Sequence, residues 1–162
     1  MEEALIDRMQ SFLLELGDDF AFVGRQRRLR IDNQWYRVDL IFFHRRLRAL
    51  VLIDLKTGDF SAEHVGRMNL YVNYAKKHWT REDEGPPLGL ILCAKGSSAV
   101  AEYAFAGITN RMMAASYTTM LPDLKQIESE MVRATLVIEE RLRRAKRERD
   151  GDMVRDQARR AS

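Results

Sequence analysis

Three charged residues in the first half of the sequence could do chemistry together: Asp39, Asp54 and Lys56. Asp54 and Lys56 are separated by one residue, directly after the apolar run 49–53. Because side chains alternate along a β-strand, both would leave the same face at the end of a buried strand. Paired carboxylates favour a hard divalent cation such as Mg²⁺, and a lysine beside it could orient a water molecule or stabilise negative charge. These are the requirements of phosphodiester hydrolysis.

The spacing of these residues is not specific by itself, since charged residues make up 31% of the chain. The neighbouring residues make the spacing a stronger indication of a site, because Asp54 ends a fully apolar stretch and Asp39 lies between Val38 and Leu40. Unpaired charge is costly to bury, so acids in such places need a compensating partner. The alternative is an ion pair of Asp54 with a lysine or an arginine that only supports the fold.

A helix is predicted at the start of the chain, over residues 2–16. Its apolar residues recur at helical spacing, acids occupy its first turn, and Gly17 follows its last. Glu15 lies near the edge of the apolar stripe, close to the C-terminal end of this helix. Most glutamates in such positions are solvated surface residues.

Three strands are then predicted to form an antiparallel meander. Their alternating and apolar patterns cover residues 20–31, 35–43 and the stretch from 49 onward. A charged turn, residues 44–48, joins the second strand to the third and is expected to lie beside the acids, where Arg45 and Arg46 could contact phosphate. Whether Asp39 and Asp54 are adjacent depends on register, and a bend or bulge could bring them together.

The rest of the chain completes a predicted α/β domain. Ser61 is a candidate N-cap for a helix that ends near residue 79, and a buried strand is expected over 88–93. This strand–helix–strand unit should be a right-handed parallel crossover. Residues 99–105 are predicted as helix or strand, 113–120 as a strand, and 122–142 as a helix. The domain is expected to cover 1–142, followed by a charged helical end or disordered tail, 143–162.

Composition excludes several classes of protein. No apolar run approaches the roughly 20 residues of a membrane span, and the start of the chain is not a signal peptide. The single Cys93 excludes an internal disulfide and fits a reducing compartment. The net charge of +3 is small, yet eight arginines lie between residues 25 and 48. Trp35 and Trp79 could stack on bases, although packing is the more ordinary role for both, and His64 and His78 are expected on a helix surface.

The sequence resembles the PD-(D/E)xK nuclease superfamily, and more closely the C-terminal nuclease domain of YhcG-type bacterial proteins. The matching stretches are residues 20–26 (FAFVGRQ), 38–48 (VDLIFFHRRLR), 52–58 (LIDLKTG) and 66–71 (GRMNLY). The resemblance implies a restriction-endonuclease-like αβββαβ core with a mixed central sheet flanked by helices. It also implies a metal-dependent cut in DNA and a bacterial, cytoplasmic setting.

Carried over by position, the resemblance makes Asp39 the first metal-binding acid and makes Asp54 and Lys56 the (D/E)xK pair. Glu15 fits the first-helix glutamate that often completes the metal site, which would hold Mg²⁺ or Mn²⁺. Gln26 is a candidate for a role beside the metal or a phosphate. With it, the candidate nucleic-acid contacts are Arg25, Arg45, Arg46, Asn69 and Tyr71.

The sequence departs from its relatives in three ways. No proline precedes Asp39, and the Gln-x-x-x-Tyr helix motif of some relatives is absent. YhcG-type proteins have a separate N-terminal domain, so this chain is expected to be either a fragment or a standalone relative, and partner recognition could lie in the missing domain or in another protein. A homodimer would cut both strands of a duplex most easily. The alternatives are a catalytically silent DNA-binding or assembly module and an RNA-directed nuclease of the same fold.

Overall fold

The structure, a computed structural model, describes residues 2–15, 19–96, 98–117, 140, 143–144 and 146–161. For residues 2, 12–15 and 98 it describes the backbone alone. The chain divides into two compact units, Met1–Lys125 and Gln126–Ser162. The predicted boundary after residue 142 stays a prediction.

The described part of the second unit is a charged helix that ends at residue 160. Its ion pairs are spaced by one helical turn, with 2.9 Å between Arg144 and Glu140 and 3.1 Å between Arg160 and Asp156. Exposed pairs of this kind contribute little stability, so the charged pattern produces a solvated helix surface. The helix predicted over 122–142 lies almost entirely outside the described residues.

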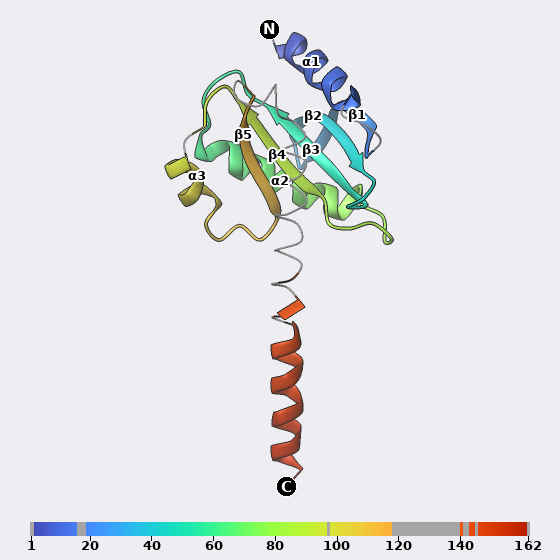
Figure 1. Cartoon of the computed structure of the whole chain (residues 1–162), viewed down its shortest axis with the longest axis vertical. Helices are drawn as coiled ribbons and strands as arrows, with labels where there is room; N and C mark the ends of the chain where they lie inside the picture. The colour runs from blue at the N-terminus through green and yellow to red at the C-terminus, as the bar shows by residue number, and fades with distance from the viewer. Residues whose placement is uncertain are drawn as a thin grey trace. The chain divides into compact units, whose positions relative to one another are not determined.

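A five-stranded mixed sheet forms the centre of the first unit (Figure 1). Its strands, in spatial order, are β1 (Phe20–Ile31), β2 (Gln34–His44), β3 (Ala49–Leu55), β4 (Leu88–Cys93) and β5 (Arg111–Ser116). The first three are antiparallel neighbours, β4 is parallel to β3, and β5 is parallel to β4. The helices are α1 (Glu2–Glu15), α2 (Ala62–His78) and α3 (Ser98–Phe105). The order from α1 to β4 confirms the predicted αβββαβ core.

The inner strands β3 and β4 are the most deeply buried part of the sheet, because every residue in both is buried. This confirms the buried strand that the apolar run predicted. The two strands are parallel and joined through α2, with Asp54 opposite Ile91. The backbone N–H of Lys56 donates to Leu92 O at 2.7 Å, one residue beyond the end of β3. The ladder therefore continues far enough to hold Lys56 in line with the strand.

The register between β2 and β3 answers the question that the sequence left open. Leu40 pairs with Ile53, so the next position of the antiparallel ladder places Asp39 opposite Asp54. No bulge is needed between these two strands. The irregularity lies instead between β1 and β2, where the register shifts between Phe22 and Gly24.

Helix α2 packs tightly against the sheet at Gly89 of β4. A Cβ atom at Gly89 would lie 2.6 Å from Cγ of Met68 and 3.0 Å from Cγ2 of Val72. Both of these α2 residues are fully buried. The absence of a side chain at Gly89 therefore sets how closely α2 approaches the strands that carry the acids.

The remaining elements of the first unit resolve the weaker predictions. Helix α1 contacts β1, β2 and β3, and its Ile6 and Met9 are buried. The stretch predicted as helix or strand forms α3, and β5 occupies the first half of the stretch predicted over 113–120. Among the residues that the structure describes, no helix combines the length and the apolar character that a membrane crossing requires.

Candidate active site

Two buried carboxylates lie side by side on adjacent strands of the sheet. Asp39 of β2 and Asp54 of β3 are 3% and 2% exposed, although both are charged residues. Oδ2 of Asp39 accepts a hydrogen bond of 2.8 Å from the backbone N–H of Leu55. This bond ties the carboxylate of one strand to the backbone of the next, directly beside Asp54.

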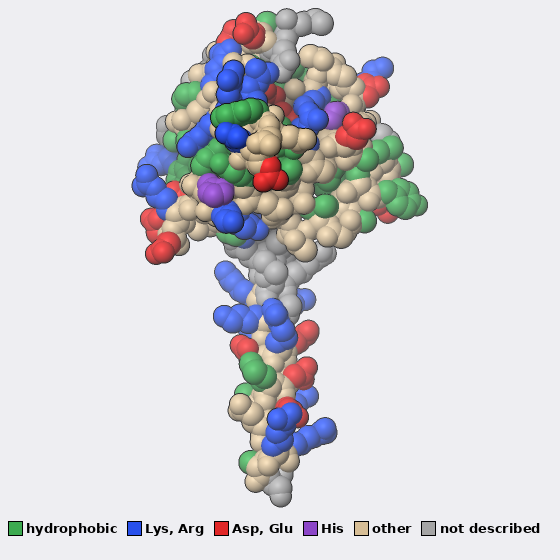
Figure 2. Space-filling view, turned by 180° about the vertical axis from the view of Figure 1, so that it is seen from behind, with side chains coloured by type: hydrophobic (Ala, Val, Ile, Leu, Met, Phe, Trp, Pro, Cys, Tyr) green, Lys and Arg blue, Asp and Glu red, His purple; other side chains and the backbone are tan. Residues whose placement is uncertain are grey.

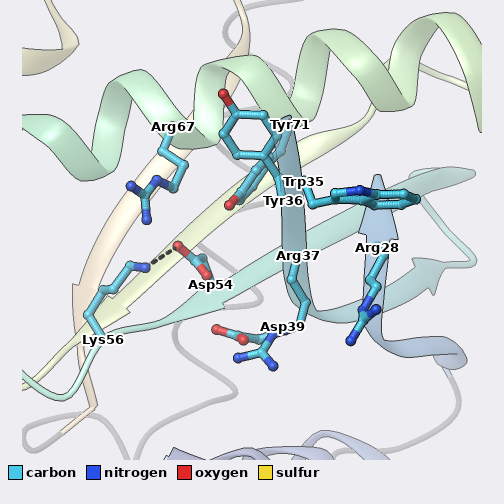
Figure 3. Close-up of a pocket in the computed structure, with 9 residues that line it drawn as sticks. All are labelled: Arg28, Trp35, Tyr36, Arg37, Asp39, Asp54, Lys56, Arg67 and Tyr71. Atoms are coloured by element: carbon cyan, nitrogen blue, oxygen red, sulfur yellow. Dashed lines mark ion pairs between the residues drawn. The ribbon is translucent and has the colours of Figure 1, made fainter. Parts of the chain in front are cut away.

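Lys56 is the immediate partner of Asp54. Its Nζ lies 2.9 Å from Oδ2 of Asp54, and the lysine side chain is 22% exposed (Figure 3). Oδ2 of Asp54 is nevertheless buried without a well-directed hydrogen bond from the described residues. The lysine supplies opposite charge from the solvent side, but the oxygen retains capacity for another partner.

The two acids and Lys56 line an open pocket of about 630 Å³ (Figure 3). The other lining residues come from β1, β2 and α2, and they are Arg28, Trp35, Tyr36, Arg37, Arg67 and Tyr71. Four cationic side chains therefore surround two carboxylates. Lys and Arg side chains are also prominent on the face of the first unit shown in Figure 2. A cationic rim around an acidic centre attracts phosphate while leaving the acids available for a cation.

Tyr71 contributes a phenol to this pocket. Its pKa is raised to about 12, first by burial and then by the negative charges of Asp54 and Asp39. The hydroxyl group therefore stays protonated at neutral pH and can donate a hydrogen bond to an anionic ligand.

His64 lies in the first turn of α2, and Lys56 and Asp54 both act on its charge. Burial, followed by the positive charge of Lys56, lowers its pKa below the usual value. Its Nδ1 accepts a 3.2 Å hydrogen bond from the backbone N–H of Ser61, the N-cap residue of α2. The neutral ring consequently carries its proton on Nε2. The imidazole is half-buried and caps the helix, a more specific role than the surface position expected for it.

The acids fit the divalent cation that the sequence resemblance implies. Carboxylate oxygens are the ligands that Mg²⁺ prefers, and two buried carboxylates stand at neighbouring positions of β2 and β3. Asp39 and Asp54 are the candidate ligands. Glu15 is the last residue of α1, but its side chain lies outside the described part of the structure. The described residues contain no cluster of three His, Cys, Asp or Glu side chains.

The other predicted contact residues are scattered. Only Tyr71 lines the pocket; Arg25 forms an ion pair with Asp7 and bonds to Gln10 of α1. Gln26 lies between Arg25, opposite Leu40, and Arg27, opposite Val38, so it faces the position of Asp39 across the ladder. Its φ of 48° is a strained value for a residue other than glycine.

The turn that contains Arg45 and Arg46 was expected to lie beside the acids, and this expectation is wrong. It follows His44, at the opposite end of the β2–β3 hairpin, because the chain runs away from Asp39 before it returns to Asp54. Arg46 pairs there with Asp19 at 3.1 Å. The distance along the strand from Asp39 to this turn is roughly 20 Å. Asn69 accepts a hydrogen bond from Asn110 and lines a different groove, beside Arg30 and Lys77.

Sequence reasoning missed several residues that line the pocket. Arg37 precedes Asp39 by two residues in β2, and Arg28 pairs with Arg37 across the β1–β2 ladder. Arg67 precedes Tyr71 by one turn of α2. The spacing of Arg37 from Asp39 and of Arg67 from Tyr71 could have been read from the sequence, whereas Arg28 could be found only with the strand register in hand.

The comparisons with known proteins agree with this geometry. A sequence profile of the family described as "YhcG PDDEXK nuclease domain" matches residues 1–136. Over 143 residues the chain is 59% identical to the Escherichia coli (strain K12) protein named "Putative nuclease YhcG". That alignment covers 88% of this chain and 38% of the relative, so this chain spans well under half of the relative's length.

Two solved structures have distant likenesses to the chain. A repair endonuclease from Pyrococcus abyssi matches with 16% identity and a TM-score of 0.47, over 68% of this chain and 46% of that chain. The EndoMS–dsDNA2 complex matches with 16% identity and a TM-score of 0.48, over 71% and 43%. The family profile is far more extensive, since it spans both acids, Lys56 and all of the first unit. The chain therefore belongs to the YhcG PDDEXK nuclease domain family.

Proposed function

We propose that the pocket hydrolyses phosphodiester bonds in DNA as a divalent-metal-dependent endonuclease, with Mg²⁺ as the working ion and Mn²⁺ as a substitute. The observation that carries the proposal is the buried pair of Asp39 and Asp54, with Lys56 2.9 Å from Asp54. A purely structural ion pair would need one acid and one cation. Here a second buried acid is held beside the pair by the hydrogen bond from Leu55 N–H to Asp39.

Asp39 and Asp54 would hold the metal ion, and Glu15 is a candidate third ligand from α1. A divalent cation bound there would lower the pKa of a coordinated water and would neutralise charge on a phosphate oxygen. The hydrogen bond from Leu55 N–H to Asp39 orients one ligand in advance, which reduces the reorganisation that binding requires.

The chain's own cations then act on the substrate and the nucleophile. The Lys56 ammonium carries three N–H donors, and those not directed at Asp54 can hold a water or a phosphate oxygen. Arg28, Arg37 and Arg67 line the same pocket and would grip phosphates on either side of the scissile bond. Tyr71 would donate its phenol proton in a hydrogen bond to the same anionic group.

The activity, substrates and partners of the whole protein are a further part of the proposal. Because the chain spans 38% of its Escherichia coli relative, we include in the proposal that a further N-terminal domain or a partner selects the substrate. A cytoplasmic setting is also part of the proposal. So is a homodimer, which would cut both strands of a duplex. The chemistry assigned to Asp39, Asp54 and Lys56 depends on none of these.

The test is a cleavage assay on supercoiled plasmid, linear duplex, branched DNA and RNA, with Mg²⁺, Mn²⁺ or a chelator. Plasmid nicking identifies an endonuclease, because a closed circle has no ends. Asp54→Asn and Lys56→Met should each reduce the rate by about 10²-fold or more, since each removes charge from the reacting centre.

Two nearby exposed residues provide matched controls, Asp59→Asn for the acid and Lys95→Met for the lysine. Both should cleave like wild type. Binding without cutting under every condition would instead favour the silent binding module, and metal-dependent cutting of RNA alone would make the substrate RNA. Cutting that survives both site variants would place the active site elsewhere.

A further inference from the structure

Trp35 is the most exposed aromatic residue in the pocket. Its side chain is 64% exposed, although tryptophan is one of the residues that a fold most readily buries. The other tryptophan, Trp79, is partly buried against the core, where its ring meets Tyr74 edge-on. Tryptophan is enriched at binding surfaces, so an exposed indole that lines a cationic pocket is a candidate for contact with a ligand.

The indole of Trp35 is held in place by its own hairpin. Arg30 pairs with Trp35 across the β1–β2 ladder, and its guanidinium carbon lies 5.8 Å from the ring centroid. Arg30 is itself fixed at the turn, because its Nε donates to Asp32 O at 2.7 Å. The ring is therefore supported by an ordered cation while most of its surface remains accessible.

Trp35 lies in line with the proposed reacting centre. Trp35, Arg37 and Asp39 follow one another along β2, and all three line the pocket (Figure 3). The strand separates Trp35 from Asp39 by roughly 13 Å. This distance spans a few nucleotides of a bound strand, with an arginine between the aromatic ring and the acids.

An aromatic ring next to arginines recognises nucleic acid in one particular way. Unpaired bases stack on aromatic side chains irrespective of sequence, while cations follow the backbone. A base inside a regular duplex has both faces covered by its neighbours and cannot stack on a protein ring unless it leaves the helix.

We propose that Trp35, supported by Arg30, is a stacking platform for an unpaired base close to the scissile phosphate. This deepens the nuclease function proposed above and rests on it. The substrate class it selects is DNA with an unpaired nucleotide a few positions from the scissile phosphate, such as a single strand, a gap or a branch, in preference to an uninterrupted duplex.

The test is a binding measurement in chelator, so that no cleavage occurs. A fluorescein-labelled oligo-dT strand and a blunt duplex are titrated with the whole chain, and fluorescence anisotropy reports the Kd. Trp35→Ala should weaken binding of the single strand by roughly tenfold or more, because one base loses its stacking partner. Trp35→Phe should retain most of the affinity, and duplex binding should change less than twofold.

Tyr103→Ala is the matched control, since Tyr103 of α3 is an 84% exposed aromatic residue that does not line the pocket. It should leave the affinity for the single strand unchanged. Because Trp35 is largely exposed, the thermal unfolding midpoint of Trp35→Ala should match that of wild type. Equal affinities of Trp35→Ala and wild type for the single strand, or equal losses on single strand and duplex, would overturn the platform.

The two proposals can fail separately. Cleavage that Asp54→Asn abolishes, together with unchanged binding by Trp35→Ala, would overturn the platform and keep the nuclease. Selective loss of single-strand binding in Trp35→Ala would support the platform even if no substrate is cut.

Discussion

In β3 and β4 every residue is buried, whereas most of β1 and the first residues of β2 are exposed or half-buried. The two regions nevertheless meet in one pocket. The buried strand β3 delivers Asp54 and is followed by Lys56, while the outer hairpin delivers Arg28, Trp35 and Arg37. Positioning of the reacting groups therefore depends on the packed interior, and contact with the substrate depends on a solvated hairpin. Changes in the two regions should have different consequences.

The largest expected effect follows removal of charge from the buried acid Asp39. Asp39→Asn keeps an oxygen that can accept the hydrogen bond from Leu55 N–H, so the fold should persist while cleavage falls by about 10³-fold. Asp39→Ala leaves that buried N–H without its partner and should also cost about 1–3 kcal/mol of unfolding free energy. Cleavage rates and urea unfolding of the two variants make the distinction. Equal activity in Asp39→Asn and wild type would remove Asp39 from the site.

The next effect concerns the contact of α2 with the inner strands. Gly89→Val would place side-chain atoms against Met68 and Val72, so we expect a loss of about 1–3 kcal/mol in unfolding free energy and a displaced Tyr71. Gly66 of α2 is the control, because a Cβ there meets nothing within 4 Å. Gly66→Ala should raise stability by up to about 1 kcal/mol through helix propensity. A Gly89→Val variant as stable as wild type would show that the close approach of α2 is not required.

Substitutions on the outer hairpin should alter affinity rather than chemistry. Arg28→Ala removes one exposed cation from the pocket rim. The logarithm of the DNA association constant falls with the logarithm of the salt concentration, and the steepness of this fall should be reduced by about one. The rate at saturating substrate should change little. A variant with normal affinity and a lost rate would place Arg28 among the reacting groups and break the division between the two regions.

The smallest expected effect is the pH dependence that His64 contributes to stability. Its folded pKa lies below the usual 6.5, so the unfolded chain binds more protons as the pH falls beneath that value. The contribution is complete above about pH 6.5 and is lost as the pH falls through the folded pKa. His64→Gln can still accept the Ser61 N–H bond but does not titrate, so its unfolding free energy should vary less over this range. Urea unfolding at several pH values measures the difference, and parallel curves for the two proteins would contradict it.

Predictability from sequence differed between the same two regions. The apolar runs of β3 and β4 and the N-cap Ser61 are local signals, and the structure has these elements where they were expected. Asp54 and Lys56 followed from alternation along one strand, and their ion pair shows that they share a face. Local patterns were sufficient wherever one strand or one helix decided the outcome.

What the sequence could not reveal depends on pairing between strands. The position of Asp39 opposite Asp54 is a property of register, and alternation within β2 alone does not determine it. The expectation that Arg45 and Arg46 would lie beside the acids was wrong for another reason: the turn between two antiparallel strands lies at the end of the hairpin away from Asp39 and Asp54. The positive φ of Gln26 has no sequence signal, because glutamine rarely adopts that conformation.

The most direct test of the paired acids is a calorimetric titration with Mn²⁺, followed by plasmid cleavage in the same samples. Wild type and Asp59→Asn should bind the ion and cut DNA, with activity rising as the site fills. Asp39→Asn and Asp54→Asn should bind at least tenfold more weakly and should not cut at the concentration that saturates wild type. Unchanged Mn²⁺ binding in both variants, or cleavage that does not follow occupancy, would contradict a metal-dependent nuclease site at Asp39 and Asp54.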